Sequence, residues 1–99
     1  MDRAISTAIQ LIGGAIRKRR VIQFRYMLRM RQAEPHCLGY DEAGALILQA
    51  WQITGPEPGW RCFEMAKLSE LSPTERHFEQ ARQDYGQGNP ALIRVVARL

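Results

Sequence analysis

The sequence has few of the features that mark secreted, membrane-spanning or metal-binding proteins. Its 99 residues include only two cysteines, Cys37 and Cys62, which lack metal-ligand spacing and are too few for a disulfide scaffold. No apolar run approaches the roughly 20 residues of a membrane span, and Met1-Asp2-Arg3 opens without the apolar core of a signal peptide. We therefore expect a soluble cytoplasmic protein with reduced, structural thiols and no membrane partner.

The sequence also lacks the arrangements of residues that enzymes use. It shows no Ser-His-Asp order, no paired metal ligands and no Gly-rich phosphate loop. His36 directly precedes Cys37, but neighbouring residues of a strand point to opposite faces, which argues against a Cys-His nucleophile. We expect no catalytic residues, no metal and no cofactor, and we predict that the protein is not an enzyme.

Acidic residues are missing from the most basic part of the chain. Seven of the fourteen Lys and Arg residues lie between Arg17 and Arg31, a stretch without Asp or Glu. The formal net charge of +4 favours acidic partners such as nucleic acid or nucleotides. Within this stretch, the candidates for contacts with a nucleic-acid backbone are Arg17, Lys18, Arg19 and Arg20. The alternative for these four residues is the solvated end of a helix.

Residues 3–19 carry apolar side chains at helical spacing. The stripe consists of Ile5, Ala8, Ile9, Ile12, Ala15 and Ile16. Asp2 is placed to cap this helix, and Gly13-Gly14 weakens it by about 1 kcal/mol per residue relative to alanine. We predict an N-terminal helix over residues 3–19 that packs one face on the core.

Alternating apolar residues predict about five antiparallel strands after this helix. In the first strand, Ile22, Phe24 and Tyr26 share one face. The expected strands are 21–26, 31–35, 37–40, 45–53 and 61–68. Residues 45–53 form the most hydrophobic stretch and should be the central strand.

Residues 72–99 are expected to form a helical extension. Ser72-Pro73-Thr74-Glu75 matches a capping box with proline at the first helical position, and residues 85–89 read as a loop. Asn89-Pro90 then favours a final helix. This helix would align Leu92, Val96 and Leu99. The β-branched residues Ile93, Val95 and Val96 leave a strand as the alternative.

The order of several segments resembles the WYL domain family. The segments, which lie across roughly residues 8–78, are Ala15-Ile16-Arg17-Lys18-Arg19-Arg20, Phe24-Arg25-Tyr26, Arg31 four residues before Pro35, Gly44 before the central strand, Arg61-x-Phe63 and Lys67-Leu68. The resemblance implies a small Sm-like, five-stranded antiparallel β-barrel with an N-terminal helix. The chain would be one WYL-like domain over residues 1–99, with its helix at 3–19, its barrel at 20–71 and the extension at 72–99. Leu46-Ile47-Leu48 replaces the Trp-Tyr-Leu signature.

The resemblance also implies a function, namely a ligand-sensing or regulatory module in bacterial transcription or phage defence. Such a module would bind an anionic ligand, either a nucleotide or single-stranded nucleic acid. Arg31 and Arg61 match family positions and would fork onto a phosphate, with Tyr26 as a ring partner. The alternative for both arginines is an ion pair with a neighbour such as Glu34 or Glu64. The complete set of candidate ligand-binding residues is Arg25, Tyr26, Arg31, His36, Arg61 and Lys67.

A second hypothesis is a protein-interaction or oligomerisation module whose ligand pocket has decayed. It depends on Ile47, which stands where the family has its signature tyrosine, and on the apolar residues of the C-terminal segment. Such an apolar stripe would pack on a second copy of the chain or on a regulatory partner protein.

Overall fold

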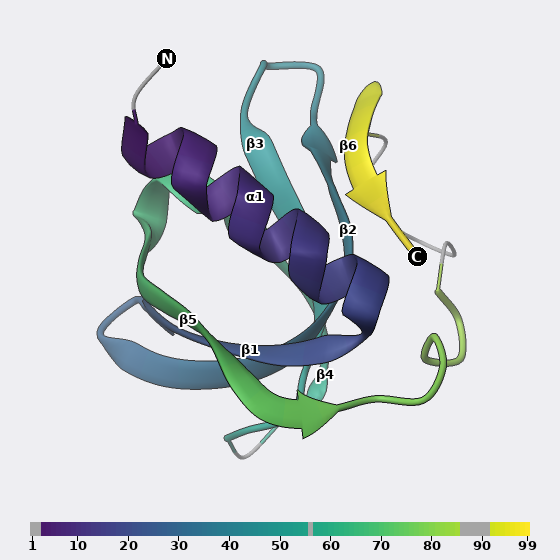
Figure 1. Ribbon diagram of the computed structural model, residues 1–99. Coiled ribbons are helices and arrows are strands. Elements are labelled where there is room, and N and C mark those ends of the chain that lie inside the picture. Colours follow the sequence, from purple (N-terminus) through teal and green to yellow (C-terminus); the bar gives the residue numbers. More distant parts are fainter. Residues whose placement is uncertain (1–2, 56, 86–91) are drawn as a thin grey trace.

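The computed structural model describes residues 3–55, 57–85 and 92–99, and in them it shows one α-helix and six strands (Figure 1). The elements are α1 (Arg3–Lys18), β1 (Arg20–Tyr26), β2 (Arg29–Tyr40), β3 (Leu46–Gln52), β4 (Gly59–Glu64), the 3₁₀ turn η1 (Met65–Lys67), β5 (Leu68–His77) and β6 (Arg94–Arg98). The predictions of a mainly β protein, an N-terminal helix and a strand at 45–53 are confirmed. The predicted caps Asp2 and Asn89-Pro90, and the loop after Tyr85, lie outside the described residues.

The strands form one antiparallel sheet that curves but does not close. Their order is β4-β3-β2-β1-β5, and β6 pairs with β2. The prediction that residues 45–53 form the central strand is wrong, because β2, which is longer, holds the middle position and β3 lies beside it. The prediction of a closed five-stranded barrel is wrong, because the end strands β4 and β5 do not pair in the part of the chain that the structure describes. At the end of β4, the amide of Glu64 donates to the hydroxyl of Tyr26 at 3.1 Å, so a side chain takes the place of a neighbouring strand there.

Strand β2 is long enough for its two halves to pair with different strands. Its first half, from Arg29 to Ala33, pairs with β1, and Cys37 to Tyr40 pair with β6. The two short strands predicted on either side of His36 are therefore one strand. The register with β3 shifts between Pro35 and Cys37, and this bulge accommodates a proline that has no amide hydrogen to donate.

The predicted helical extension is wrong in both of its parts. The capping-box residues lie in β5, where Ser72 is opposite Gln23, and the Thr74 hydroxyl donates to the Val21 carbonyl at 2.8 Å. Residues 94–98 form a strand, as the β-branched alternative proposed, because the Cys37–Tyr40 edge of β2 offers backbone partners that a helix would leave unpaired. The strand predicted at 61–68 ends at Glu64, and η1 then turns the chain into β5.

Helix α1 lies across one face of the curved sheet (Figure 1). Its predicted apolar stripe supplies Ile12 and Ile16, which are fully buried. They join a core to which the strands contribute Ile22, Phe24, Ala33, Leu38, Leu48, Ala50 and Phe63. This core fixes the inner faces of β1, β2 and β3.

Candidate functional site

A hollow of about 190 Å³ lies beside the first residues of β2. It is lined by Arg29, Met30, Arg31, Gln52, Thr54, Gly55, Glu57 and Arg61. We call it the arginine hollow, because three of its lining residues are arginines. The two arginines that the sequence singled out, Arg31 and Arg61, both belong to it, although they come from β2 and β4.

The hollow exists because β3 leaves β2 early. The last hydrogen bonds at this end of the pair join Gln32 to the two residues after β3. The Ile53 amide donates to the Gln32 carbonyl at 2.9 Å, and the Gln32 amide donates to the side-chain hydroxyl of Thr54 at 3.0 Å. Backbone groups of alternate residues in a strand point to the same side. The N–H and C=O of Met30 therefore point toward the hollow, where the described residues provide no strand to pair with them.

The side chain of Arg31 is held in place by neutral groups. Its Nε donates to the Tyr26 carbonyl at 3.2 Å, and its Nη1 donates to Oε1 of Gln52 at 3.1 Å. The guanidinium carbon lies 5.4 Å from the centre of the Tyr26 ring and 5.8 Å from that of Phe63. These contacts fix the guanidinium without cancelling its charge.

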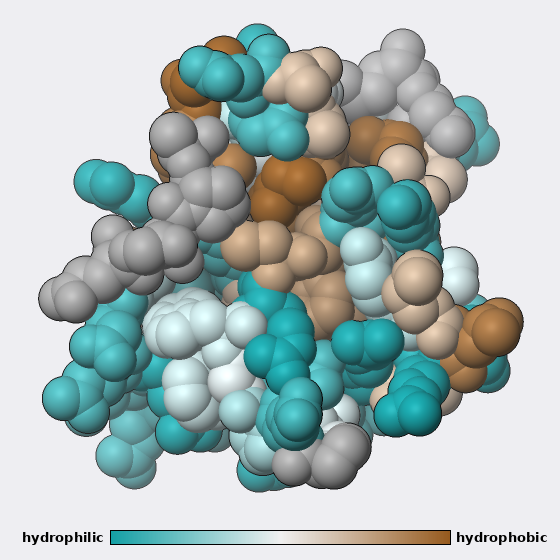
Figure 2. All heavy atoms as spheres, turned by 180° about the vertical axis from the view of Figure 1, so that it is seen from behind, coloured by the Kyte–Doolittle hydropathy of each residue, from teal (hydrophilic) through white to brown (hydrophobic). Residues whose placement is uncertain are grey.

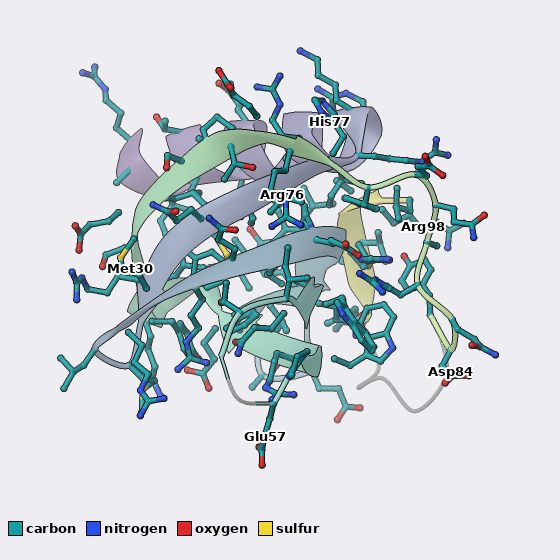
Figure 3. The ribbon with its side chains drawn as sticks, turned by 90° about the horizontal axis from the view of Figure 1, so that it is seen from below. Met30, Glu57, Arg76, His77, Asp84 and Arg98 are labelled. Carbon is teal, nitrogen blue, oxygen red and sulfur yellow. The ribbon has the colours of Figure 1, made fainter. Side chains whose placement is uncertain are left out.

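Arg61 is fixed in the same manner, by backbone carbonyls. Its Nη1 donates to the Trp60 carbonyl at 2.9 Å, and its Nη2 donates to the Glu57 carbonyl at 2.5 Å. The carboxylate of Glu57 points away from the body of the protein (Figure 3). In the described parts of the chain, Arg29, Arg31 and Arg61 have no ion pair with an acid. The hollow therefore presents positive charge on groups that are already oriented.

The acids that the sequence offered as partners for these arginines bind other cations. Glu34 pairs with Arg82, with a distance of 2.7 Å between Oε1 and Nε, and Glu64 pairs with Lys67 at 3.3 Å. The hypothesis that Arg31 and Arg61 are members of structural ion pairs with Glu34 or Glu64 is therefore wrong.

Three other candidates lie outside the arginine hollow. Tyr26 stands behind Arg31, with its ring edge-on to Phe63 at 5.0 Å and its hydroxyl accepting the Glu64 amide. Arg25 is ion-paired with Glu70. Lys67 lies in η1 and is paired as described above. The structure thus gives Tyr26 a supporting position and leaves Arg25 and Lys67 away from the hollow.

The four basic residues proposed for backbone contacts lie at the opposite end of β1. Arg17 and Lys18 end α1 and are exposed, as is Arg19, which has a φ of 52°. Arg20 is half-buried and is paired across the strands with His77. The seven residues of β1 separate this basic corner from the arginine hollow by about 20 Å. The sequence stretch that appeared continuous therefore forms two separate basic surfaces.

His36 is buried and serves the fold. Its Nε2 accepts the Arg82 amide at 3.0 Å, so Nδ1 carries the proton and donates to the Glu34 carbonyl at 2.8 Å. Its ring stacks on Phe78, with 5.3 Å between ring centres, and meets the edge of Trp60 at 4.8 Å. Burial lowers the pKa of His36, although the Glu34 carbonyl and carboxylate oppose this shift. Both ring nitrogens are used, so His36 is not available to a ligand in this structure.

The sequence did not reveal the segment that covers His36. Residues 78–85, which we call the strap, contact side chains of β2, β3 and β4. In Figure 3 the strap runs down the right-hand side of the molecule to Asp84. Arg82 forks onto the buried carboxylate of Glu34, at 2.7 and 3.0 Å, and its guanidinium carbon lies 4.9 Å from the Trp51 ring centre. Tyr85 donates to the His36 carbonyl at 3.1 Å and stacks on Trp60. The one signal available in the sequence was an acid, Glu34, within the predicted strand 31–35.

The two cysteines are free thiols, and neither is activated. Cys37 is buried on β2, directly after His36. Burial raises the pKa of the Cys37 thiol and raises that of Tyr85 to about 12. A protonated thiol beside a neutral imidazole does not form the ion pair that cysteine nucleophiles use.

No family model, curated protein or solved structure matches this chain. Among residues 3–55, 57–85 and 92–99, His, Cys, Asp and Glu do not gather in any group of three that could hold a metal ion. In the same ranges, the structure has no helix with the length and apolar character needed to cross a membrane.

Proposed function

We propose that the protein is a non-enzymatic regulatory module that binds an anionic ligand, a nucleotide or single-stranded nucleic acid, in the arginine hollow. The observation that carries this proposal is the convergence of Arg31 and Arg61, from separate strands, on one hollow in which no described acid neutralises them. The resemblance of residues 8–78 to the WYL domain agrees with this function and supplies the regulatory context.

The hydrogen-bonding capacity of the hollow fits a phosphate group. Nη2 of Arg31 and Nε of Arg61 have no acceptor among the described residues, and the Met30 amide points to the same space. The Thr54 hydroxyl accepts the Gln32 amide and keeps its own hydrogen to donate. Charged and neutral donors around one opening are what a phosphate or a carboxylate requires. Because the donors are already oriented, binding costs little side-chain entropy.

The experiment is to measure the affinity of Arg31→Ala and Arg61→Ala for nucleotides and short oligonucleotides at several salt concentrations. Losing one charge-assisted hydrogen bond of about 1.5 to 3 kcal/mol should weaken binding roughly 10- to 100-fold. For oligonucleotides, the slope of log K against log salt should fall by about one.

The matched control is Arg94→Ala, which removes the same charge from β6, outside the hollow. Thermal melting of each variant will show that the fold is kept. If Arg31→Ala and Arg61→Ala bind with unchanged affinity and unchanged salt slope, the site assignment is wrong.

A second candidate function, a protein-interaction or oligomerisation module, is favoured by one observation. Ile93, Val95 and Val96, in and next to β6, are 67%, 45% and 40% exposed. This function predicts a dimer, and sedimentation that shows only monomer at high protein concentration would exclude that form of it.

A further inference from the structure

The turn between β1 and β2 exposes large apolar side chains. Tyr26 pairs with Arg29, so the turn itself consists of Met27 and Leu28. Met27 is 66% exposed and Leu28 is 91% exposed, and Met30, just inside β2, is 43% exposed. We call Met27 and Leu28 the hairpin tip. In Figure 2 an apolar group projects from the right-hand edge, where this hairpin ends.

The backbone of the hairpin tip is unfavourable for the residues that occupy it. Met27 has a φ of 52° and Leu28 a φ of 67°. Two-residue hairpin turns with positive φ at both positions strongly prefer Asn-Gly, because Cβ crowds the following carbonyl oxygen in the left-handed region, which Gly avoids and Asn offsets by local hydrogen bonds. Met27 and Leu28 therefore do not make the fold more stable than Asn-Gly would, because their backbone conformation is less favourable and their side chains are exposed. Residues held in such sparsely populated backbone conformations cluster at active sites, ligand clamps and switch regions.

The hairpin tip stands next to the arginine hollow. Met30 and Arg29 line the hollow, and Leu28 directly precedes Arg29. From Met30 to Leu28 the chain advances about 7 Å, which is the length of two residues of a strand. A partner that contacts the hairpin tip with an apolar surface can therefore place a neighbouring anionic group next to the arginines of the hollow.

We propose that the hairpin tip contacts the bases of a single-stranded nucleic acid whose phosphate lies in the arginine hollow. This inference rests on the proposed function and narrows the ligand from nucleotides in general to a polynucleotide. Met30 borders the hollow and can pack against the base of the nucleotide bound there. Leu28 and Met27 lie farther out and reach a neighbouring base, which only a longer strand supplies.

The chemistry of the surroundings favours nucleic acid over an apolar protein surface. Arg29, Arg31 and Arg61 lie within or beside this region without an acidic partner among the described residues, so an uncharged apolar partner would leave their charge unmatched. Single strands alternate anionic phosphates with flat apolar bases, and this alternation matches arginines beside Met and Leu side chains. A double helix hides its base faces, which excludes it as the partner of an apolar tip of this kind unless it is unstacked.

The test is the double variant Met27→Asn with Leu28→Gly, which removes both apolar side chains and installs the preferred turn. It should raise Tm by about 4 °C or more, since the backbone conformation then suits its residues. Binding of inorganic phosphate and of a mononucleotide should be unchanged. Binding of a single-stranded oligonucleotide of about eight residues should weaken roughly five- to tenfold, as expected for the loss of a base contact. Ile93→Asn, which removes an exposed apolar side chain from a distant segment, should leave all of these affinities unchanged.

The outcomes separate this inference from the proposed function. If the double variant binds the oligonucleotide as tightly as the natural sequence does, the hairpin tip does not contact bases and the inference is overturned. If it loses phosphate and mononucleotide equally, the change has acted on the hollow and the inference is also overturned. If the natural sequence binds neither phosphate nor any nucleotide, both the proposed function and this inference are wrong. Binding to vesicles containing anionic lipid, in the absence of oligonucleotide binding, would assign the hairpin tip to a membrane surface and likewise overturn the inference.

Discussion

Acidification to below about pH 6.5 should destabilise this protein through one buried residue, His36. The folded structure requires the neutral ring, because Nε2 accepts the Arg82 amide while Nδ1–H donates to the Glu34 carbonyl. A proton on Nε2 would replace this hydrogen bond with a clash of two donors. It would also place a positive charge under Phe78, Trp60 and the guanidinium of Arg82, with Glu34 as the one compensating acid among the groups that act on it.

The sign follows from the direction of the shift. Burial lowers the pKa of His36 in the folded state below its ordinary value of 6.5, so the unfolded chain takes up the proton first as the pH falls. The contribution to stability is complete above pH 6.5 and is lost as the pH falls toward the folded-state pKa. Within that window, the free energy of unfolding should fall by up to about 1.4 kcal/mol per pH unit. Below the folded-state pKa, both states are protonated and the loss levels off.

The assay is urea denaturation at a series of pH values from about 5 to about 7.5, where Asp and Glu contribute least. His36→Gln keeps a donor and an acceptor in the side chain but does not titrate, so its stability should vary less with pH. His77→Gln, at an exposed position on β5, is the matched control and should keep the pH dependence of the natural sequence. A flat profile for the natural sequence across this range, or an unchanged slope in His36→Gln, would refute the reasoning.

Two further predictions concern packing. In Gly39→Ala the new Cβ would lie 2.8 Å from the Arg94 carbonyl oxygen, so β6 must shift, and we expect a loss of about 1 to 3 kcal/mol in denaturant titrations. Gly14→Ala is its control, because its Cβ has no atom closer than 3.8 Å, and the helix should gain about 1 kcal/mol; equal effects of the two changes would contradict the argument. Phe63→Ala removes a ring that is 1% exposed and should lower the free energy of unfolding by about 3 to 5 kcal/mol, whereas a loss under 1 kcal/mol would show that Phe63 is not part of a packed core.

The parts of the fold that were predictable from sequence are those fixed by periodicity. The stripe that includes Ile12 and Ile16 indicated a helix, and both residues are fully buried in it. The alternation from Ile22 to Tyr26 indicated a strand, which is β1, and the apolar run around Leu48 indicated another, which is β3, although not at the centre of the sheet as predicted. In these segments the local pattern and the tertiary contacts favour the same structure.

The errors arose where a local signal competed with a distant partner. Ser72-Pro73-Thr74-Glu75 is a good helix start in isolation, yet β1 presents an unpaired edge that binds these residues as a strand. The C-terminal segment combines helical spacing of Leu92, Val96 and Leu99 with β-branched side chains, and the open edge of β2 decided in favour of the strand. Neither unpaired edge can be predicted from the sequence, because each depends on where β1 and β2 separate in the folded sheet.

The same distinction applies to the site. Arg31 and Arg61 were identified by position in a family pattern, and the structure places both at one hollow. The strap was missed, because Arg82 meets Glu34 only after a long excursion of the chain. The sequence predicts His36 as a ligand-binding residue, but its Nε2 accepts the amide of Arg82 in the strap and its Nδ1 donates to the Glu34 carbonyl. The basic residues from Arg17 to Arg31 are close together in the sequence, but β1 separates the two ends of this stretch, so they form two surfaces and not one.

The pairing of β6 with the second half of β2 has a consequence for how the chain is made. Tyr40 finds its partner Arg94 only after fifty-four further residues have been synthesised. At roughly 5 to 20 residues per second, this leaves the Cys37–Tyr40 edge open for roughly 3 to 11 s on the ribosome. An open edge beside buried Leu38 is a template for pairing with other chains. Slow synthesis or loss of the last residues should therefore appear first as aggregation.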